Sequence, residues 1–204
     1  MSKYPIIIFE GIEASGKTTN FKIAANYLKK RRKSFIKLRE PGGSIFSEKI
    51  RKLILNKKLN LNNKTDLLLF YAGRSENFEK IIKKNYKKKI ILIDRFTDST
   101  IAYQHYGMKI DLKVIKMLNK FIIGNFNPDI VFLSTVNSKN LQKRLRNRSN
   151  LNRYDKFKLK FYNKVQNGYE KISSNKSIYI KINSNTNTIN EVKKIIINKL
   201  EKLI

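Results

Sequence analysis

The chain has 204 residues, of which 45 are basic, 15 are acidic and none is cysteine, giving a formal net charge of +30. Without cysteine, neither a disulfide framework nor a thiolate metal site is available. The opening stretch from Met1 to Pro5 leads into only four apolar residues before Glu10, far short of a signal sequence or of the ~20 residues that span a membrane. We therefore expect a cytoplasmic protein with no membrane partner.

The excess of basic residues resembles that of a nucleic-acid binder. However, 35 of these residues are Lys and only 10 are Arg, and the Lys residues are spread along the chain together with 29 Ile and 24 Asn. Enrichment of this kind is typical of codon bias, and solvated helix faces and loops explain the Lys runs. We expect no nucleic-acid partner, and a basic nucleic-acid-binding NTPase stays as an alternative. The informative charges are the Arg residues and the carboxylates.

Short apolar runs alternate with helical segments along the chain. The runs, each expected to form a strand, occupy residues 6–9, 35–38, 90–93, 130–133 and 177–180. Helices are expected after Gly16, from near Ser44, and over residues 64–86, 111–121, 138–148, 154–172 and 190–203, with Thr65 and Asp111 as N-caps. Alternation of this kind predicts an α/β fold, a five-stranded parallel sheet flanked by helices on both faces. With no repeat and no flexible linker, residues 1–204 are expected to form one domain.

The first strand runs directly into a complete G-x-x-x-x-G-K-[ST] motif, with a helix expected after it. In this P-loop, glycines let backbone N–H groups surround phosphate oxygens, Lys17 adds a positive charge, and the Thr18 hydroxyl is a ligand for Mg²⁺. The motif predicts a P-loop NTPase fold. The residues expected to bind ATP are Gly11, Ile12, Glu13, Ala14, Ser15, Gly16, Lys17, Thr18 and Thr19.

Two other P-loop classes fit the sequence poorly. Residues Asn63 to Asp66 spell the N-K-x-D guanine motif of GTPases, but they enter a helix rather than leave a strand, and no D-x-x-G occurs in the chain. A motor ATPase or helicase needs a longer chain and an acidic pair that closes a strand. Here the strand at residues 90–93 closes with Asp94 and Arg95.

The Asp94-Arg95 pair lies at the carboxyl end of a central strand, where open α/β sheets bind ligands. Asp94 can hold Mg²⁺ or its waters, and Arg95 can bind an acceptor phosphate through two N–H groups. The second strand ends similarly, in Arg39-Glu-Pro-Gly-Gly43. Acidic residues are rare in this chain, yet several follow strands, which predicts a single site that contains Glu10, Glu13, Glu40 and Asp94.

These segments, taken together, resemble the thymidylate kinases, in particular the bacterial form. The motifs that carry the resemblance follow the family's order over nearly the whole chain and are Phe9–Thr19, Arg39–Gly43, Phe70–Arg74, Asp94–Ser99 and Ala102–Gln104. The resemblance implies phosphorylation of dTMP to dTDP with Mg·ATP, in dTTP synthesis, and a homodimer. Another P-loop kinase, acting on a different nucleotide or on a deoxynucleoside, stays open as an alternative.

The resemblance also implies a dTMP site. Glu13 would approach the sugar 3′-hydroxyl, Phe70 would stack on thymine, and Arg74, one helical turn later, would reach the base or phosphate. The other implied contacts are Arg39, Arg95 and Arg51 with the acceptor phosphate, Tyr103 with the 2′ position, and Ser99 and Gln104 with the base.

Residues 143–156 resemble the family's mobile lid. Four of the ten Arg residues fall within ten positions here, although Lys dominates elsewhere. Guanidinium groups that close over ATP would neutralise charge on the transferring phosphoryl group. The resemblance to the bacterial form, whose P-loop lacks Arg, implies that the lid supplies them, and the P-loop of this chain contains no Arg. Arg148 and Arg153 are better placed for this role than Arg144. The catalytic candidates are therefore Lys17, Asp94, Arg95, Arg148 and Arg153.

Overall fold

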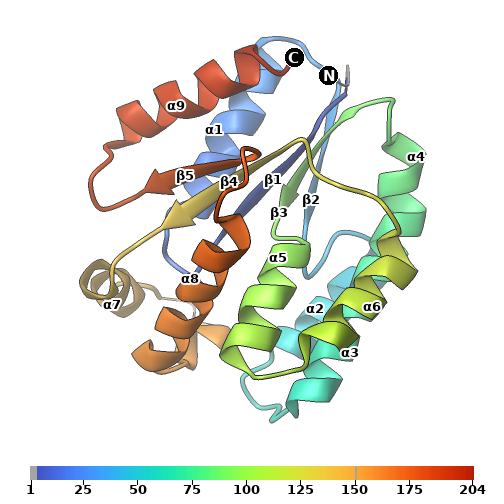
Figure 1. The fold of residues 1–204 in the computed structure, drawn as a ribbon, viewed down its shortest axis with the longest axis vertical. Helices are drawn as coiled ribbons and strands as arrows, with labels where there is room; N and C mark the ends of the chain where they lie inside the picture. Colours follow the sequence, from blue (N-terminus) through green and yellow to red (C-terminus); the bar gives the residue numbers. More distant parts are fainter. Residues whose placement is uncertain (1–3, 150) are drawn as a thin grey trace.

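A parallel sheet forms the centre of the molecule in the computed structural model, which describes residues 4–149 and 151–204. Its five strands are arranged in the order β2-β3-β1-β4-β5 (Figure 1). They are β1 (Ile6–Gly11), β2 (Phe35–Arg39), β3 (Ile90–Asp94), β4 (Ile130–Thr135) and β5 (Tyr179–Asn183). This confirms the predicted parallel sheet. Residues 1–3 of the expected N-terminal stretch and Asn150 of the expected lid lie outside the described residues.

Helices cover both faces of the sheet, and the helical segments that the structure describes have the following bounds. They are α1 (Lys17–Lys30), α2 (Ile45–Leu55), α3 (Asn63–Asn77), α4 (Lys83–Asn85), α5 (Thr97–Thr100), α6 (Leu112–Ile123), α7 (Ser138–Arg146), α8 (Leu159–Ser173) and α9 (Ile189–Glu201), with π-helical segments η1 (Phe78–Ile82) and η2 (Ile101–Gly107) and the 3₁₀ segment η3 (Tyr154–Lys156). Among the described residues, no helix combines the length and the apolarity that crossing a membrane requires.

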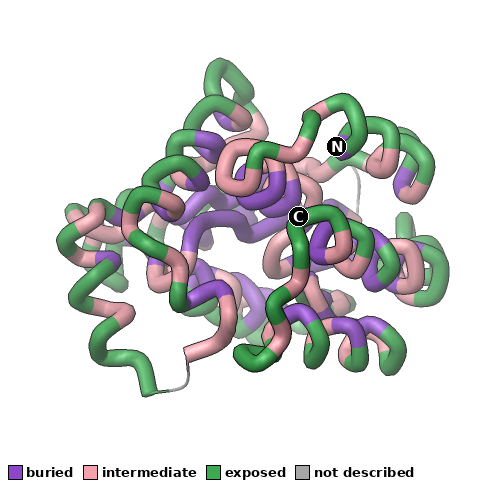
Figure 2. The backbone as a smooth tube through the Cα atoms, turned by 90° about the horizontal axis from the view of Figure 1, so that it is seen from below, coloured by how far each residue is buried: buried purple, intermediate pink, exposed green. Residues whose placement is uncertain are grey.

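The strands divide the hydrophobic core into two layers because alternate side chains point to opposite faces. Ile7 and Phe9 of β1 pack in the layer that α1 and α9 cover. Ile6 and Ile8 pack in the opposite layer, against Phe78 of η1. Figure 2 shows the buried strands between helices whose outer sides are exposed. A strand that is covered on both faces appears in the sequence as a continuous apolar run. This is why the central strands could be predicted.

Several predicted element bounds are wrong in detail. Asn62, not Thr65, caps α3, because the Asn62 side chain accepts a hydrogen bond from the Thr65 backbone N–H at 2.9 Å. The helix predicted over 64–86 contains the π-helical segment η1, and the one over 154–172 is divided at Phe157, whose backbone is extended. The last strand begins at Tyr179 rather than at residue 177. Asp111 caps α6 as predicted.

The helical segment formed by α5 and η2, residues 97–107, was not predicted from the sequence. It starts without a side-chain cap, and its first turns contain Thr97, Thr100 and Ile101, which are β-branched and therefore weak helix formers. Packing holds it instead: the Tyr106 ring lies against Gly168 of α8, where an added Cβ would come within 2.6 Å of that ring. This segment places Ser99, Tyr103 and Gln104 beside the carboxyl edge of the sheet.

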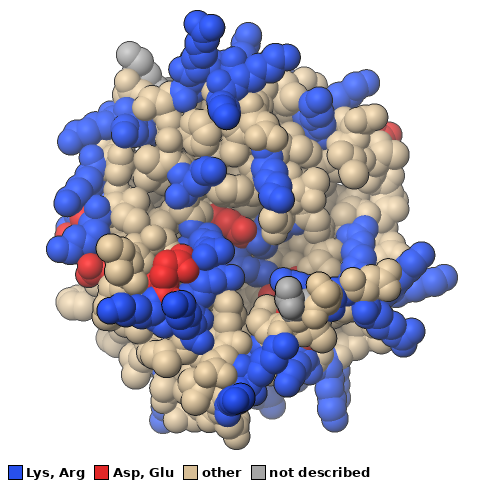
Figure 3. Space-filling view, turned by 180° about the vertical axis from the view of Figure 1, so that it is seen from behind, with Lys and Arg blue, Asp and Glu red and all other residues tan. Residues whose placement is uncertain are grey.

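Basic side chains are spread over the face of the molecule that Figure 3 shows. Figure 3 shows Lys and Arg distributed over the whole of one face, which is hollowed near its middle, where acidic and basic side chains lie together. The distribution fits a solvated lysine-rich surface.

Candidate active site

The P-loop wraps around the first turn of α1. Gly11 has a φ of 139°, and a Cβ there would come within 2.3 Å of the Ser134 carbonyl oxygen, so only glycine fits. Gly16 has a φ of 92° and caps α1 without a side-chain hydrogen bond. The first N–H groups of α1 are therefore available to an anion. Residues 12–19 line a cavity of about 680 Å³, whereas Gly11 is not among the lining residues of the described chain.

Lys17 and Asp94 lie side by side in this cavity. Parallel pairing of β1 and β3 sets Phe9 opposite Asp94, so both loops leave the sheet at the same edge. The Lys17 ammonium group forms an ion pair with the Asp94 carboxylate. Burial lowers the pKa of Lys17, as does the nearby charge of Arg95, and the ion pair with Asp94 acts in the opposite direction. Lys17 is only 8% exposed, so its charge acts at short range in a partly dry site.

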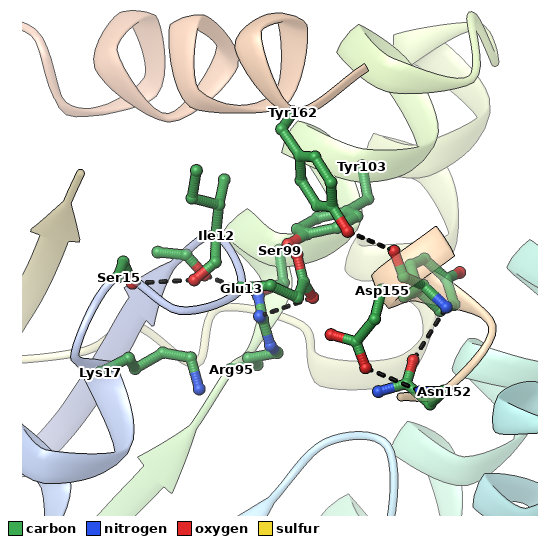
Figure 4. A network of polar contacts seen from close by, with 12 residues as sticks. Ile12, Glu13, Ser15, Lys17, Arg95, Ser99, Tyr103, Asn152, Asp155 and Tyr162 are labelled. Carbon is green, nitrogen blue, oxygen red and sulfur yellow. Dashed lines mark hydrogen bonds and ion pairs between the residues drawn. The ribbon is translucent and has the colours of Figure 1, made fainter. Parts of the chain in front are cut away.

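Arg95 joins the P-loop to the neighbouring strand end. Its Nη1 donates a hydrogen bond to the Gly11 carbonyl at 2.8 Å, and its Nη2 pairs with Glu13 at 3.0 Å. The hydroxyl of Tyr103 donates to the other Glu13 oxygen. Figure 4 shows Glu13, Arg95 and Tyr103 pointing toward one another. A guanidinium held in this way is fixed beside the phosphate loop before any ligand arrives.

Glu10, expected at the same site, lies below it. It is fully buried and does not line the cavity. It accepts hydrogen bonds from the backbone of Phe96 at 2.8 Å, from the Ser99 hydroxyl at 2.5 Å and from Tyr169 at 3.0 Å. The Ser99 hydroxyl, predicted to lie near the base, is thus committed to Glu10. Glu10 fixes the turn that carries Arg95, a supporting role that the sequence analysis missed.

Arg74 lines the cavity but is only 1% exposed. Its Nε pairs with Glu40 at 2.8 Å, and its Nη2 donates to the Phe96 carbonyl at 3.0 Å and the Thr100 hydroxyl at 2.9 Å. The guanidinium also lies over the rings of Tyr71 and Phe96. Burial raises the pKa of Glu40, opposed by the charge of Arg74. Arg74 is thus a buried wall of the cavity as well as a ligand candidate.

The remaining acceptor-site candidates also line the cavity. Phe70 is half-buried and meets Tyr154 edge to face, with the ring centroids 6.1 Å apart. Arg39 is exposed and pairs with Glu48 through both carboxylate oxygens, at 2.9 and 3.2 Å. Arg51 donates to the Pro41 carbonyl at 2.6 Å. Burial lowers the pKa of Arg51, as does the charge of Arg39.

Three of the four arginines in the expected lid occupy different environments. Arg148 lines the cavity with its side chain 44% exposed and pairs with Asp155 at 2.6 Å. Arg153 forms an ion pair with Asp66 and is not among the cavity-lining residues of the described chain. Arg144 donates to the carbonyl of the P-loop residue Ala14 at 2.9 Å, a contact that the sequence analysis missed. The structure brings Arg148 and Arg144 to the cavity and turns Arg153 toward α3.

The comparisons with known proteins all point to one family. A family model described as thymidylate kinase matches residues 9–196. The thymidylate kinase of Thermosipho africanus is 42% identical over 168 residues, covering 82% of this chain and 83% of that protein. The one of Wolbachia pipientis wMel is 37% identical over 188 residues, covering 91% and 93%. The crystal structure of thymidylate kinase from Ehrlichia chaffeensis superposes with a TM-score of 0.77 at 35% identity, covering 97% of this chain and 98% of that chain.

Proposed function

We infer how the site works from the premise that this chain belongs to the thymidylate kinase family. The protein is a dTMP kinase, which transfers the γ-phosphoryl group of ATP to dTMP and gives dTDP for dTTP synthesis. The observation that carries our assignment of roles is the link between Arg95 and the P-loop through Gly11 and Glu13. This link places the Arg95 guanidinium, which we assign to the acceptor phosphate, next to the P-loop, which we assign to the phosphates of the ATP donor.

On the donor side, P-loop amides and Lys17 bind the ATP phosphates. The oxygen donors nearby fit Mg²⁺: Thr18 is exposed at the start of α1, and the Asp94 carboxylate lines the cavity. The described residues contain no cluster of three or more His, Cys, Asp or Glu side chains. In nucleotide-binding sites, Mg²⁺ commonly takes one or two protein oxygens and completes its shell with phosphates and water. Bound there, Mg²⁺ would neutralise charge on the phosphates.

On the acceptor side, we propose that dTMP lies between Arg95 and the helices α3 and η2. The proposed base contacts are Phe70 and Gln104, with Arg74 and Ser99 behind them. Glu13 and Tyr103, which hydrogen-bond each other, meet the sugar. Arg95 binds the 5′-phosphate, with Arg39 and Arg51 at the cavity entrance. Charge-assisted, two-pronged contacts of this kind are strong and set the orientation of the phosphate.

Phosphoryl transfer then needs alignment more than proton chemistry, because the dTMP phosphate oxygen is already a nucleophile. Arg95 holds this oxygen in line, while Lys17 and the lid guanidiniums stabilise the charge that spreads over the transferred group. Among the lid arginines, Arg148 is best placed for this because it lines the cavity. Arg153 contributes at the base of the lid, and closure of the lid excludes water.

The function is tested by a coupled assay of ADP release over dTMP, dUMP, dCMP, dGMP, dAMP, UMP and thymidine. We expect dTMP to give the highest kcat/KM, and we expect EDTA to abolish turnover until Mg²⁺ is restored. A matched assay with single-stranded DNA or RNA tests the nucleic-acid-binding alternative. Turnover that nucleic acid stimulates and that no monophosphate supports would contradict the assignment.

We also propose that the protein is a homodimer. We propose a cytoplasmic location, where ATP is available as the phosphoryl donor. Large apolar side chains are exposed on three adjacent helices: Ile45 of α2 (85% exposed), Leu68 of α3 (58%), and Met117 (62%) and Phe121 (86%) of α6. Such a surface is typical of a subunit interface.

Light scattering coupled to gel filtration should therefore give twice the chain's 24.0 kDa. Leu68→Asp should shift the mass to that of one chain, because an unpaired charge would be buried at the interface. Ile189→Asp, an exposed apolar position on α9, serves as the control and should leave the mass unchanged. A single-chain mass for the unaltered protein would refute the dimer.

A further inference from the structure

A buried carboxylate outside the predicted site connects the lid to the acceptor pocket. Asp66 of α3 is only 1% exposed, although it is charged. One of its oxygens accepts from Arg153, and the other accepts from the hydroxyl of Tyr154 and from Gln104 Nε2 at 3.2 Å. Arg153 and Tyr154 belong to the end of the lid, and Gln104 belongs to η2 and lines the cavity. Asp66 thus joins segments from three parts of the chain.

Arg153 makes further contacts that fix the same end of the lid. Its Nε donates to the Ile54 carbonyl at 2.9 Å, and its backbone N–H donates to the Leu55 carbonyl at 3.4 Å. These carbonyls lie in the last turn of α2, where the backbone has no partner within the helix. Arg153 therefore fastens the lid to α2 and α3 together.

The contacts of Gln104 connect this cluster of side chains to the cavity in which the ligand is expected to bind. Its two N–H groups donate to Asp66 and, at 3.2 Å, to the hydroxyl of Tyr154. The amide oxygen is therefore the group that can accept a hydrogen bond from a base. Tyr154 lines the same cavity, with its ring edge to face with Phe70 and Tyr103. Burial and the charge of Asp66 raise the pKa of Tyr154, so its hydroxyl stays a donor.

We propose that Asp66 is a positioning residue for the dTMP kinase reaction: it anchors the end of the lid through Arg153 and Tyr154, and it sets the orientation of Gln104 in the acceptor pocket. The inference rests on the proposed dTMP site. It also explains the Asn63–Asp66 sequence, which matches a guanine motif. Asp66 binds residues of the chain's own lid rather than a nucleotide. A buried ion pair alone is weak evidence for a stabilising role, so the test must separate positioning from folding.

The variant Asp66→Asn keeps the size of the side chain and removes the charge. We expect the KM for dTMP to rise about tenfold, with the KM for ATP changed less than about twofold, because the P-loop does not touch Asp66. Hydrogen exchange of the peptide that covers residues 152–157 should become at least about tenfold faster, while exchange in β1 and β3 stays unchanged. Asp66→Glu should recover most of the dTMP affinity, since it restores the charge.

Asp111→Asn is the matched control, because Asn caps α6 as well as Asp does, and it should match the unaltered enzyme in every measurement. Slow exchange at residues 152–157 in Asp66→Asn would overturn the anchoring role. An equal rise in the KM for dTMP and for ATP would overturn the positioning role. The proposed function fails separately, if the unaltered enzyme does not phosphorylate dTMP.

Discussion

Replacing Lys17 by Ala should lower kcat about 10³-fold, one of the two largest losses that we expect from a single substitution. Lys17 is the one side-chain cation of the P-loop, and its ammonium group is buried. In the proposed mechanism it stabilises the charge that develops on the transferring phosphoryl group. Removing one such preorganised donor lowers kcat by about 10²–10³-fold in other enzymes. Because Lys17 contributes a full charge in a site with little water, we expect a loss near the upper end of this range. Steady-state kinetics of ADP release measures the effect.

Lys22→Ala is the control for Lys17→Ala, because Lys22 is an exposed lysine on the same helix. It should retain nearly full activity. The Lys17 variant also leaves Asp94 without its ion pair, so thermal unfolding should be measured in parallel. Full turnover by a folded Lys17→Ala enzyme would show that the P-loop is not the site of phosphoryl transfer.

Arg148→Ala should lower kcat by about 10³-fold and leave the KM values for dTMP and ATP within about threefold. The guanidinium is expected to meet the phosphoryl group mainly in the transition state, as an arginine finger does, and such residues contribute 10³–10⁵-fold. Its side chain is 44% exposed and is held to the cavity wall by Asp155. A contact made only in the transition state lowers kcat without raising KM.

The comparison variant is Arg146→Ala, two residues away in the last turn of α7 and exposed. It removes the same charge from the same region, so it isolates the position of the guanidinium. Equal losses in both variants would mean that the lid acts through its overall charge. A loss of kcat confined to Arg153→Ala would instead transfer the catalytic role to Arg153.

The parts of this protein that were predictable from sequence are those with a local signal. The P-loop requires glycine at positions 11 and 16, where φ is 139° and 92°, and its lysine and threonine follow in sequence. The central strands β1, β3 and β4 are largely apolar on both faces, so their runs are visible without any knowledge of the fold. Asp94 and Arg95 follow from the rule that ligands bind at the carboxyl edge of a parallel sheet.

The features that escaped prediction depend on contacts between distant residues. Helix 97–107 is weak in local propensity and forms because α8 packs against it. In the sequence, Glu10 cannot be distinguished from the other carboxylates at strand ends. Only the structure shows that it is buried and binds the backbone of Phe96, the residue after Arg95. The Asp66 contact with Arg153 spans 87 positions in the sequence. A single sequence contains no signal that pairs two such residues, whereas the local excess of Arg over Lys is a signal within one segment and led to the prediction of a lid.

The central claim is that one cavity binds both substrates, with the ATP phosphates on the P-loop and Lys17 and the dTMP phosphate on the guanidinium of Arg95. A crystal structure of the enzyme with dTMP and a non-hydrolysable ATP analogue tests it most directly. We predict Lys17 in contact with the analogue's terminal phosphates and Arg95 within hydrogen-bond distance of the dTMP phosphate, with Phe70 against the thymine. A monophosphate bound elsewhere, with Arg39, Arg74 and Arg95 all directed away from it, would contradict the account.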